Sequence, residues 1–308
     1  MVSPDQQNGL VGEIGKRLGA LRDTLGDGVR GRIAGADGHE RMLGLIEETG
    51  PRWFDESRPI RRVHEDASMF IGGLRALLLQ SMHPLAMAGV AIHSDYRNDP
   101  WGRLQRTADF LAATTFGTER AAQEAVDRVR AVHSRVSGTA PDGRPYSAND
   151  PHLLRWVHVA EVDSFLAAHT KFGREKLDQA GRDGYVADTA RVARALGVPA
   201  PPTSERALRD QLRMFRSEMH ASKEARDAAR YLVVTPPLPV PARIAYSAIA
   251  TAAVSTLPRW VRTGLRLPYV PVADVVVGQP LGELVTRALR WALDDPALKA
   301  DAARTNAL

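Results

Sequence analysis

Apolar residues that recur at helical spacing are the feature that most constrains the fold of this chain. In the first 30 residues they stand three or four positions apart, at Leu10, Ile14, Leu18, Leu21, Leu25 and Val29. This spacing places them on one face of an amphipathic helix. The sequence has no alternating strand–helix rhythm and no Gly-rich phosphate loop. We therefore predict an all-α protein that forms a single globular helical domain over 1–308.

The same criterion predicts helices along the rest of the chain, with Pro- and Gly-rich connectors between them. The expected helices are 40–48, 67–90 with a bend at Pro84, 101–116, 118–136, 152–171, 189–196, 204–219, 223–233, 241–256 and 282–293. A turn is expected around Gly138 and 142–145. Only the valine-rich segment 270–277 is predicted to be a strand. We interpret 1–35 as a peripheral N-terminal helix and 66–172 as the core motif region.

Composition excludes several classes of function. The chain has a net charge of +5, and 36 of its 41 basic residues are arginine because only five are lysine. Aromatic residues do not interleave with the basic ones, so nucleic acid is not an expected partner. Cysteine is absent, which excludes thiolate-ligated haem, covalently attached haem, iron–sulfur clusters and cysteine-based zinc sites. Any metal must be bound by His, Asp, Glu, Tyr or Met.

The apolar segments do not predict a membrane span. Segment 77–92 contains Gln80, His83 and Pro84, and segment 244–257 has 14 residues, fewer than the roughly 20 that a bilayer requires. The N-terminus lacks the basic start and apolar stretch of a signal peptide. We expect a cytoplasmic protein without a transmembrane segment. Peripheral association of the N-terminal helix with a membrane is the alternative.

Two arginines and a hydroxyl lie close together in the motif Arg103-Leu-Gln-Arg106-Thr107. An arginine-rich helix face exposed to solvent would be the ordinary explanation. However, Thr107, Phe110 and Thr114 share that side of the predicted helix, which indicates that part of the face is buried. A buried arginine requires an anionic partner. A propionate, a bound oxygen species or Asp99 could fill that role.

His133 lies within an apolar helical stripe, with Arg130 about one turn before it. The stripe consists of Val126, Val129, Val132 and Val136. The structural explanation is a core histidine whose ring is hydrogen-bonded to a carbonyl. The functional one is an axial haem ligand, with Arg130 either meeting a propionate or fixing the helix.

His158 competes with His133, because Arg155-Trp-Val-His158 repeats the order of Arg130-Ala-Val-His133 on another apolar helix. Spacing alone does not decide between them. His93 begins a polar turn and could line the mouth of a pocket. His83 precedes Pro84, where a donor to freed carbonyls is needed, and this structural role is favoured over ligation. Surface or capping positions are predicted for the remaining histidines: His39, His64, His152, His169 and His220.

Several motifs in sequential order resemble a known family. They are Leu78-Leu-Gln-Ser-Met-His83-Pro84, Gly89-Val-Ala-Ile-His93-Ser94, Asp99-Pro-Trp-Gly-Arg103-Leu-Gln-Arg106-Thr107, Phe116-Gly117-Thr118, Val132-His133, Asp142-Gly-Arg-Pro-Tyr146 and Leu154-Arg-Trp-Val-His158. Together they resemble the bacterial oxygenase family related to the MpaB oxygenase of mycophenolic acid biosynthesis. That family includes the latex-clearing proteins, which are rubber oxygenases. The resemblance is close over roughly 70–170 and weaker through 257–260.

The resemblance implies a globin-like helical core that holds non-covalent haem b. The distal Arg-x-x-Lys-Thr motif of latex-clearing proteins matches Arg103, Arg106 and Thr107, and their proximal Arg-x-x-His segment matches Arg130 and His133. Arg106 stands where those relatives have a lysine. A neutral amine can ligate iron, whereas a guanidinium stays protonated and cannot. The site is therefore expected to be five-coordinate, water-bound or ligated by another histidine such as His93.

These implications lead to one preferred hypothesis, a haem b-dependent oxygenase with iron bound by His133. Arg106 and Thr107 are expected to polarise dioxygen, and Arg103 to hold a propionate or the distal geometry. Segments 77–90 and 244–254 would line a channel for a hydrophobic substrate, such as an unsaturated prenyl or lipid-like molecule. A haem peroxidase-type enzyme and a non-catalytic haem- or lipid-binding protein are the alternatives. The oligomeric state is not predicted.

Overall fold

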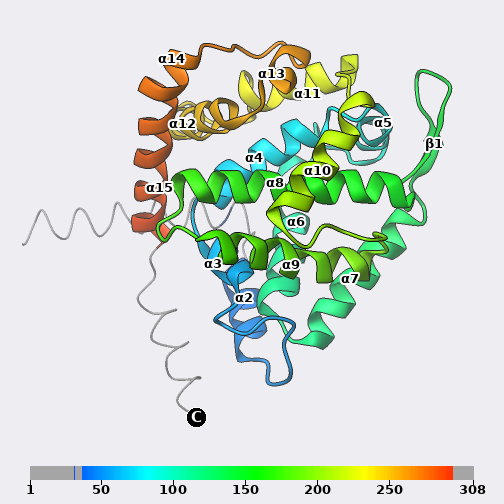
Figure 1. Ribbon diagram of the computed structural model, residues 1–308, viewed down its shortest axis with the longest axis vertical. Helices are drawn as coiled ribbons and strands as arrows, with labels where there is room; N and C mark the ends of the chain where they lie inside the picture. The colour runs from blue at the N-terminus through cyan, green and yellow to red at the C-terminus, as the bar shows by residue number, and fades with distance from the viewer. Residues whose placement is uncertain (1–30, 32–36, 294–308) are drawn as a thin grey trace, which may run out of the picture.

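The computed structural model describes residue 31 and residues 37–293, and helices make up most of these residues. The all-α class is therefore confirmed. Figure 1 shows α8 crossing the middle of the molecule, with α4 behind it and a small hairpin extending from one side. The predicted N-terminal helix lies outside the described residues, apart from residue 31.

The helices follow one another with short connections. In chain order they are α2 (Gly38–Glu47), α3 (Pro59–Glu65), α4 (Met69–Gln80), α5 (Pro84–His93), α6 (Pro100–Phe116), α7 (Glu119–His133), α8 (Pro151–Phe172), α9 (Gln179–Leu196), α10 (Glu205–Met214), η1 (Phe215–Ser217), α11 (Lys223–Val233), α12 (Val240–Thr256), α13 (Arg259–Gly264), α14 (Pro271–Ala273), η2 (Asp274–Gly278) and α15 (Gln279–Leu293). The sheet consists of β1 (Ser137–Thr139) and β2 (Pro145–Ser147), which pair antiparallel.

Helix starts follow the proline and capping residues of the sequence. The Asp99 carboxylate accepts a hydrogen bond from the Gly102 N–H at the start of α6, with Pro100 in the first turn. At the start of α8 the Asp150 carboxylate accepts from the His152 N–H. These side chains bind N–H groups that have no partner within the helix. The predicted starts of both helices are therefore confirmed to within a residue.

The predicted bend at Pro84 is confirmed, and it separates two helices. The axes of α4 and α5 differ in direction by 108°. Proline supplies no N–H and is tolerated in the first turn of α5. In the described part of the chain, no single helix is long and apolar enough to cross a membrane, and α4 and α5 meet that criterion only as this bent pair.

The prediction of a strand at 270–277 is wrong, because this segment is helical. No neighbouring strand is available to it within the described residues, whose one sheet is the β1–β2 hairpin. The buried Arg262 guanidinium instead binds the Asp274 carboxylate, at 2.6 Å and 3.1 Å. Val272, Val275 and Val276 are exposed to solvent. Valine propensity for strands is thus overridden by tertiary context.

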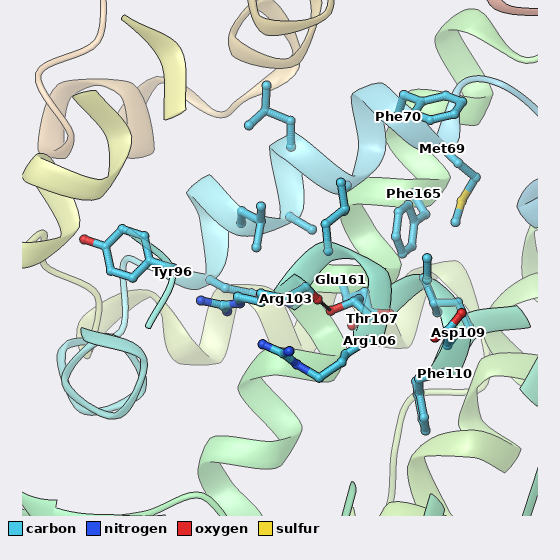
Figure 2. A pocket seen from close by; sticks show the side chains of 18 of the residues that line it. Met69, Phe70, Tyr96, Arg103, Arg106, Thr107, Asp109, Phe110, Glu161 and Phe165 are labelled. Carbon is cyan, nitrogen blue, oxygen red and sulfur yellow. Dashed lines mark hydrogen bonds between the residues drawn. The ribbon is translucent and has the colours of Figure 1, made fainter. Parts of the chain in front are cut away.

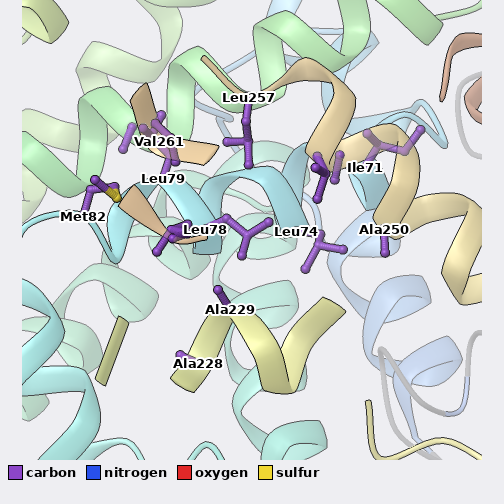
Figure 3. Close-up of a cluster of buried hydrophobic side chains, with 14 of the residues drawn as sticks. Ile71, Leu74, Leu78, Leu79, Met82, Ala228, Ala229, Ala250, Leu257 and Val261 are labelled. Atoms are coloured by element: carbon purple, nitrogen blue, oxygen red, sulfur yellow. The ribbon is translucent and has the colours of Figure 1, made fainter. Parts of the chain in front are cut away.

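The largest apolar core surrounds α4. Figure 3 shows α4 side chains packed between α11 on one side and α12 and α13 on the other. The labelled members are Ile71, Leu74, Leu78, Leu79, Met82, Ala228, Ala229, Ala250, Leu257 and Val261, and all are buried. Small alanines on α11 and α12 let these helices lie close to the larger side chains of α4.

α4 packs closely against α8 because one residue in the contact is glycine. A Cβ atom at Gly72 would lie 2.7 Å from Cδ1 and 3.1 Å from Cα of Phe165. One turn further along α4, the buried Arg75 guanidinium lies 2.8 Å from the Asp163 carboxylate and donates to the Ser164 hydroxyl at 2.7 Å. Arg75 also donates to the Thr256 carbonyl at the end of α12. A buried charge requires partners of this kind.

Replacing Gly72 with alanine should therefore destabilise the fold. The added methyl group must displace Phe165, so the free energy of unfolding should fall by about 1–3 kcal/mol in urea denaturation. Gly73→Ala is the matched control, because its nearest neighbour across the contact is 3.9 Å away. Its higher helix propensity should leave stability unchanged or raised by up to about 1 kcal/mol. Equal stabilities of the two variants would contradict the proposed role of Gly72.

Candidate functional site

A large cavity that is open to solvent lies beside the α4–α8 contact. Its volume is about 2050 Å³, and its walls include residues of α3, α4, α5, α6, α7, α8, α11, α12 and α15 and of β2. Most of the lining side chains are apolar. Cavities that hold one drug-sized ligand measure about 300–1,000 Å³. This cavity therefore has room for more than one small molecule.

Arg103 brings an uncompensated positive charge to the cavity wall. Its guanidinium donates to the Ser94 hydroxyl at 2.8 Å, and no carboxylate within the described residues pairs with it. Burial and the neighbouring charge of Arg106 lower the pKa of Arg103. Figure 2 shows both arginine side chains extending in the same direction from α6. A half-buried guanidinium without a carboxylate partner favours an anionic ligand.

Arg106 and Thr107 also line the cavity, but both are exposed to solvent. The Arg106 guanidinium lies 3.3 Å from the Asp99 carboxylate, which was one of the three partners expected for this arginine pair. The Thr107 hydroxyl donates to the Arg103 carbonyl at 3.1 Å. The expectation of a partly buried α6 face is confirmed by Arg103, which is half-buried, and by Thr114, which is buried.

His133 ends α7 and lines the same cavity. Its ring is half-buried and has no hydrogen-bond partner within 37–293, and burial lowers its pKa. A neutral imidazole without a partner is suited to ligate a metal. Arg130 is exposed, does not line the cavity and donates to the Ala195 carbonyl at 3.2 Å. Arg130 was expected either to meet a propionate or to fix the helix. Its contact with Ala195 agrees with the second of these roles.

His158 does not line the cavity, although it is part of α8. Its Nε2 is buried without a hydrogen-bond partner, and burial lowers its pKa to about 4. His93 does line the cavity, and its Nε2 lies 3.0 Å from the Tyr146 hydroxyl. Tyr146 is supplied by β2, so the hairpin positions the ring of His93.

Two histidines predicted at surface or capping positions are instead part of the cavity wall. His64 is half-buried, contacts the Thr115 hydroxyl at 2.8 Å, and burial lowers its pKa to about 3. His169 is 1% exposed, and neither ring nitrogen has a hydrogen-bond partner. The surface prediction is therefore wrong for both.

Glu161 is a further cavity residue to which the sequence analysis gave no role. Its side chain, labelled in Figure 2, lines the cavity and forms no ion pair within the described residues. Burial raises its pKa to about 7. Helical spacing could have identified it, since Glu161 lies four residues after Val157 and four before Phe165, which both line the cavity. A carboxyl that titrates near neutral pH can hold or release a proton there.

The fold and this cavity define a helical protein with a largely apolar cavity, whose wall also carries cationic, imidazole and carboxyl groups. Residues 61–292 match the family described as ER-bound oxygenase mpaB/B'/rubber oxygenase, catalytic domain. The chain belongs to this family, as the motifs indicated, and has its general oxygenase role. No curated protein and no solved structure gives a significant match. The globin-like character of the core stays a prediction.

The raised pKa of Glu161 should make stability depend on pH. Its carboxyl ionises near 4.5 when unfolded and near 7 when folded, so stability should fall between these values and stay level above them. In the variant Glu161→Gln the side chain is neutral at both low and high pH. Its stability relative to wild type should therefore rise by up to about 3 kcal/mol between about pH 4 and pH 8.

Urea denaturation of the haem-free chain at the two pH values measures this difference. Glu175→Gln, which replaces an exposed cavity-mouth carboxylate, is the matched control. A stability difference between Glu161→Gln and wild type that is the same at both pH values would contradict the assignment.

Proposed function

We propose that the protein is a haem b-dependent oxygenase whose iron is held by His133 and whose substrate is hydrophobic. The observation that carries the proposal is that one cavity wall holds two half-buried groups without partners among the described residues: an imidazole with no hydrogen bond and a guanidinium with no carboxylate. His133 supplies the former and Arg103 the latter. A histidine nitrogen is a common axial ligand of haem iron, and cationic side chains are common partners of the haem propionates.

Three further observations support haem as the cofactor of this cavity. The cavity volume of about 2050 Å³ leaves room for a substrate beside a porphyrin. Burial keeps the His133 ring neutral by lowering its pKa, and only a neutral imidazole can ligate iron. The chain has no cysteine to compete as a ligand. When bound, the haem would supply the iron centre for dioxygen activation.

The distal residues would orient the reacting molecules by hydrogen bonding and would hold or exchange protons beside them. The Arg106 guanidinium lies 3.3 Å from the Asp99 carboxylate, and a guanidinium donates hydrogen bonds but cannot ligate iron. Thr107 presents a hydroxyl from the next residue of α6. Glu161, with its pKa near 7, can exchange a proton within the cavity. In this proposal Arg103 binds a propionate.

The lining favours an apolar substrate. Leu77 and Val90 from α4 and α5, and Ile249 from α12, line the cavity, within the two apolar segments expected to form a channel. An extended unsaturated hydrocarbon, such as a prenyl or lipid-like chain, would bury its surface there. Oxygen consumption by the haem-loaded chain with such a substrate tests this proposal. Haem binding without oxygen uptake would identify a binding protein, and peroxide-dependent turnover alone would identify a peroxidase.

His133→Ala should abolish haem binding, whereas His158→Ala should retain it. Removing the axial nitrogen removes the bond to iron, while His158 does not line the cavity. The Soret absorption of each variant, purified after expression with added haem, measures the outcome. Circular dichroism confirms that both variants fold. The reverse result would move the axial role to His158, and a wild-type chain without Soret absorption would exclude haem.

Arg106→Lys should change the iron spin state in the resting ferric protein. A lysine amine can lose its proton and ligate iron, whereas the guanidinium of Arg106 cannot. The variant should therefore acquire a six-coordinate low-spin absorption spectrum as the pH is raised. Arg106→Gln, which has no amine, is the control and should resemble wild type. Identical pH-dependent spectra for wild type and Arg106→Lys would contradict this role of position 106.

A further inference from the structure

Three potential metal ligands converge outside the cavity. His83 precedes α5, His152 lies in the first turn of α8, and Glu218 follows η1. One ligand atom from each lies within 4.8 Å of the other two. The Glu218 carboxylate oxygen lies 2.7 Å from His152 Nε2 and 3.6 Å from His83 Nε2. None of the three lines the cavity.

Among these three residues, His83 has a buried ring nitrogen for which its surroundings supply no partner. Its side chain is 2% exposed, and its Nε2 has no hydrogen-bond partner among the described residues. The 3.6 Å separation from Glu218 is too long for a hydrogen bond. A buried polar atom without a partner costs free energy unless something else binds it. Nε2 points toward the carboxylate and imidazole that could share such a ligand.

We infer that His83, His152 and Glu218 form a binding site for a divalent transition-metal cation of the Zn²⁺ type. Two imidazole nitrogens and one carboxylate oxygen are ligands that Zn²⁺ uses, with a water molecule completing four-coordination. Tetrahedral ligands at about 2.0 Å from the metal are about 3.3 Å apart. The separations of 2.7 Å and 3.6 Å fall on either side of this value.

The surroundings of the site are compatible with a cation. His152 and Glu218 are exposed by 49% and 42%, so a metal can enter from solvent. Burial lowers the pKa of His83, so its ring is neutral and ready to ligate. His83 Nδ1 accepts the Ala86 N–H at 3.5 Å, the outer limit of a hydrogen bond. Metal binding at Nε2 would place the proton on Nδ1 and give up only this weak contact.

A metal here would join two segments that line the cavity to the segment that carries Glu218. Leu85 of α5 and Leu153 of α8 lie next to the ligands in sequence and line the cavity. The Trp156 and Phe215 rings pack against His83 and His152, with centroids 6.3 Å and 4.8 Å away. The ion would therefore fix the α4–α5 bend relative to the start of α8.

Metal titration of the full-length chain tests the site. Calorimetry with Zn²⁺ should give one equivalent bound per chain, in both the haem-free and the haem-loaded protein. Co²⁺ in place of Zn²⁺ should produce the visible absorption of a four-coordinate site. His152→Ala and Glu218→Gln should each weaken binding at least about tenfold, the loss caused even by removing an outer-shell partner. His220→Ala, a nearby histidine outside the site, should bind as wild type.

Thermal denaturation provides a second measurement, because a ligand that binds only the folded chain raises its melting temperature. Zn²⁺ should raise the melting temperature of wild type and His220→Ala but not that of His152→Ala. His83 is left unchanged because it caps α5. Failure of wild type to bind one equivalent, or wild-type affinity in both His152→Ala and Glu218→Gln, would overturn the proposal. The group would then be a polar cluster without a metal.

Discussion

The close packing of α4 against α8 is the constraint on which the rest of the structure depends. Gly72 allows the two backbones to approach at Phe165, and the Arg75–Asp163 ion pair connects them beside that point. Arg75 also reaches the end of α12 through Thr256. Because α4, α8 and α12 all contribute to the cavity wall, their separation determines the shape of the space in which ligands are held.

The helical part of the fold could be predicted because helix formation leaves local traces. Apolar spacing, the prolines of first turns and caps such as Asp99 and Asp150 all act within a few residues. The segment 270–277 could not be predicted in this way. Its conformation depends on Arg262 and on the lack of a neighbouring strand among the described residues. Such long-range conditions are not visible in valine content.

The candidate site was predictable to a different degree for each residue. Arg103 and His133, which the family motifs marked, line one cavity, and their roles toward a haem stay a prediction. Helical spacing could not reveal that Arg106 pairs with Asp99 while Arg103 pairs with no carboxylate of the described residues. His169 was missed because burial of a single histidine is set by its neighbours in space, not in sequence. The position of a residue along a helix specifies the helix face on which its side chain lies. The groups that this side chain contacts come from other helices and strands, and the spacing does not reveal them.

The positive charge of Arg103, with which no carboxylate of the described residues pairs, would link ligand supply to the amount of folded protein. A half-buried cation without an anionic partner would make the empty chain less stable than a filled one. Any anion that neutralises it in the folded state shifts the folding equilibrium by mass action. Chains made faster than their ligand is provided would unfold more often and be degraded sooner. The cell's stock of this protein would then follow its stock of the ligand.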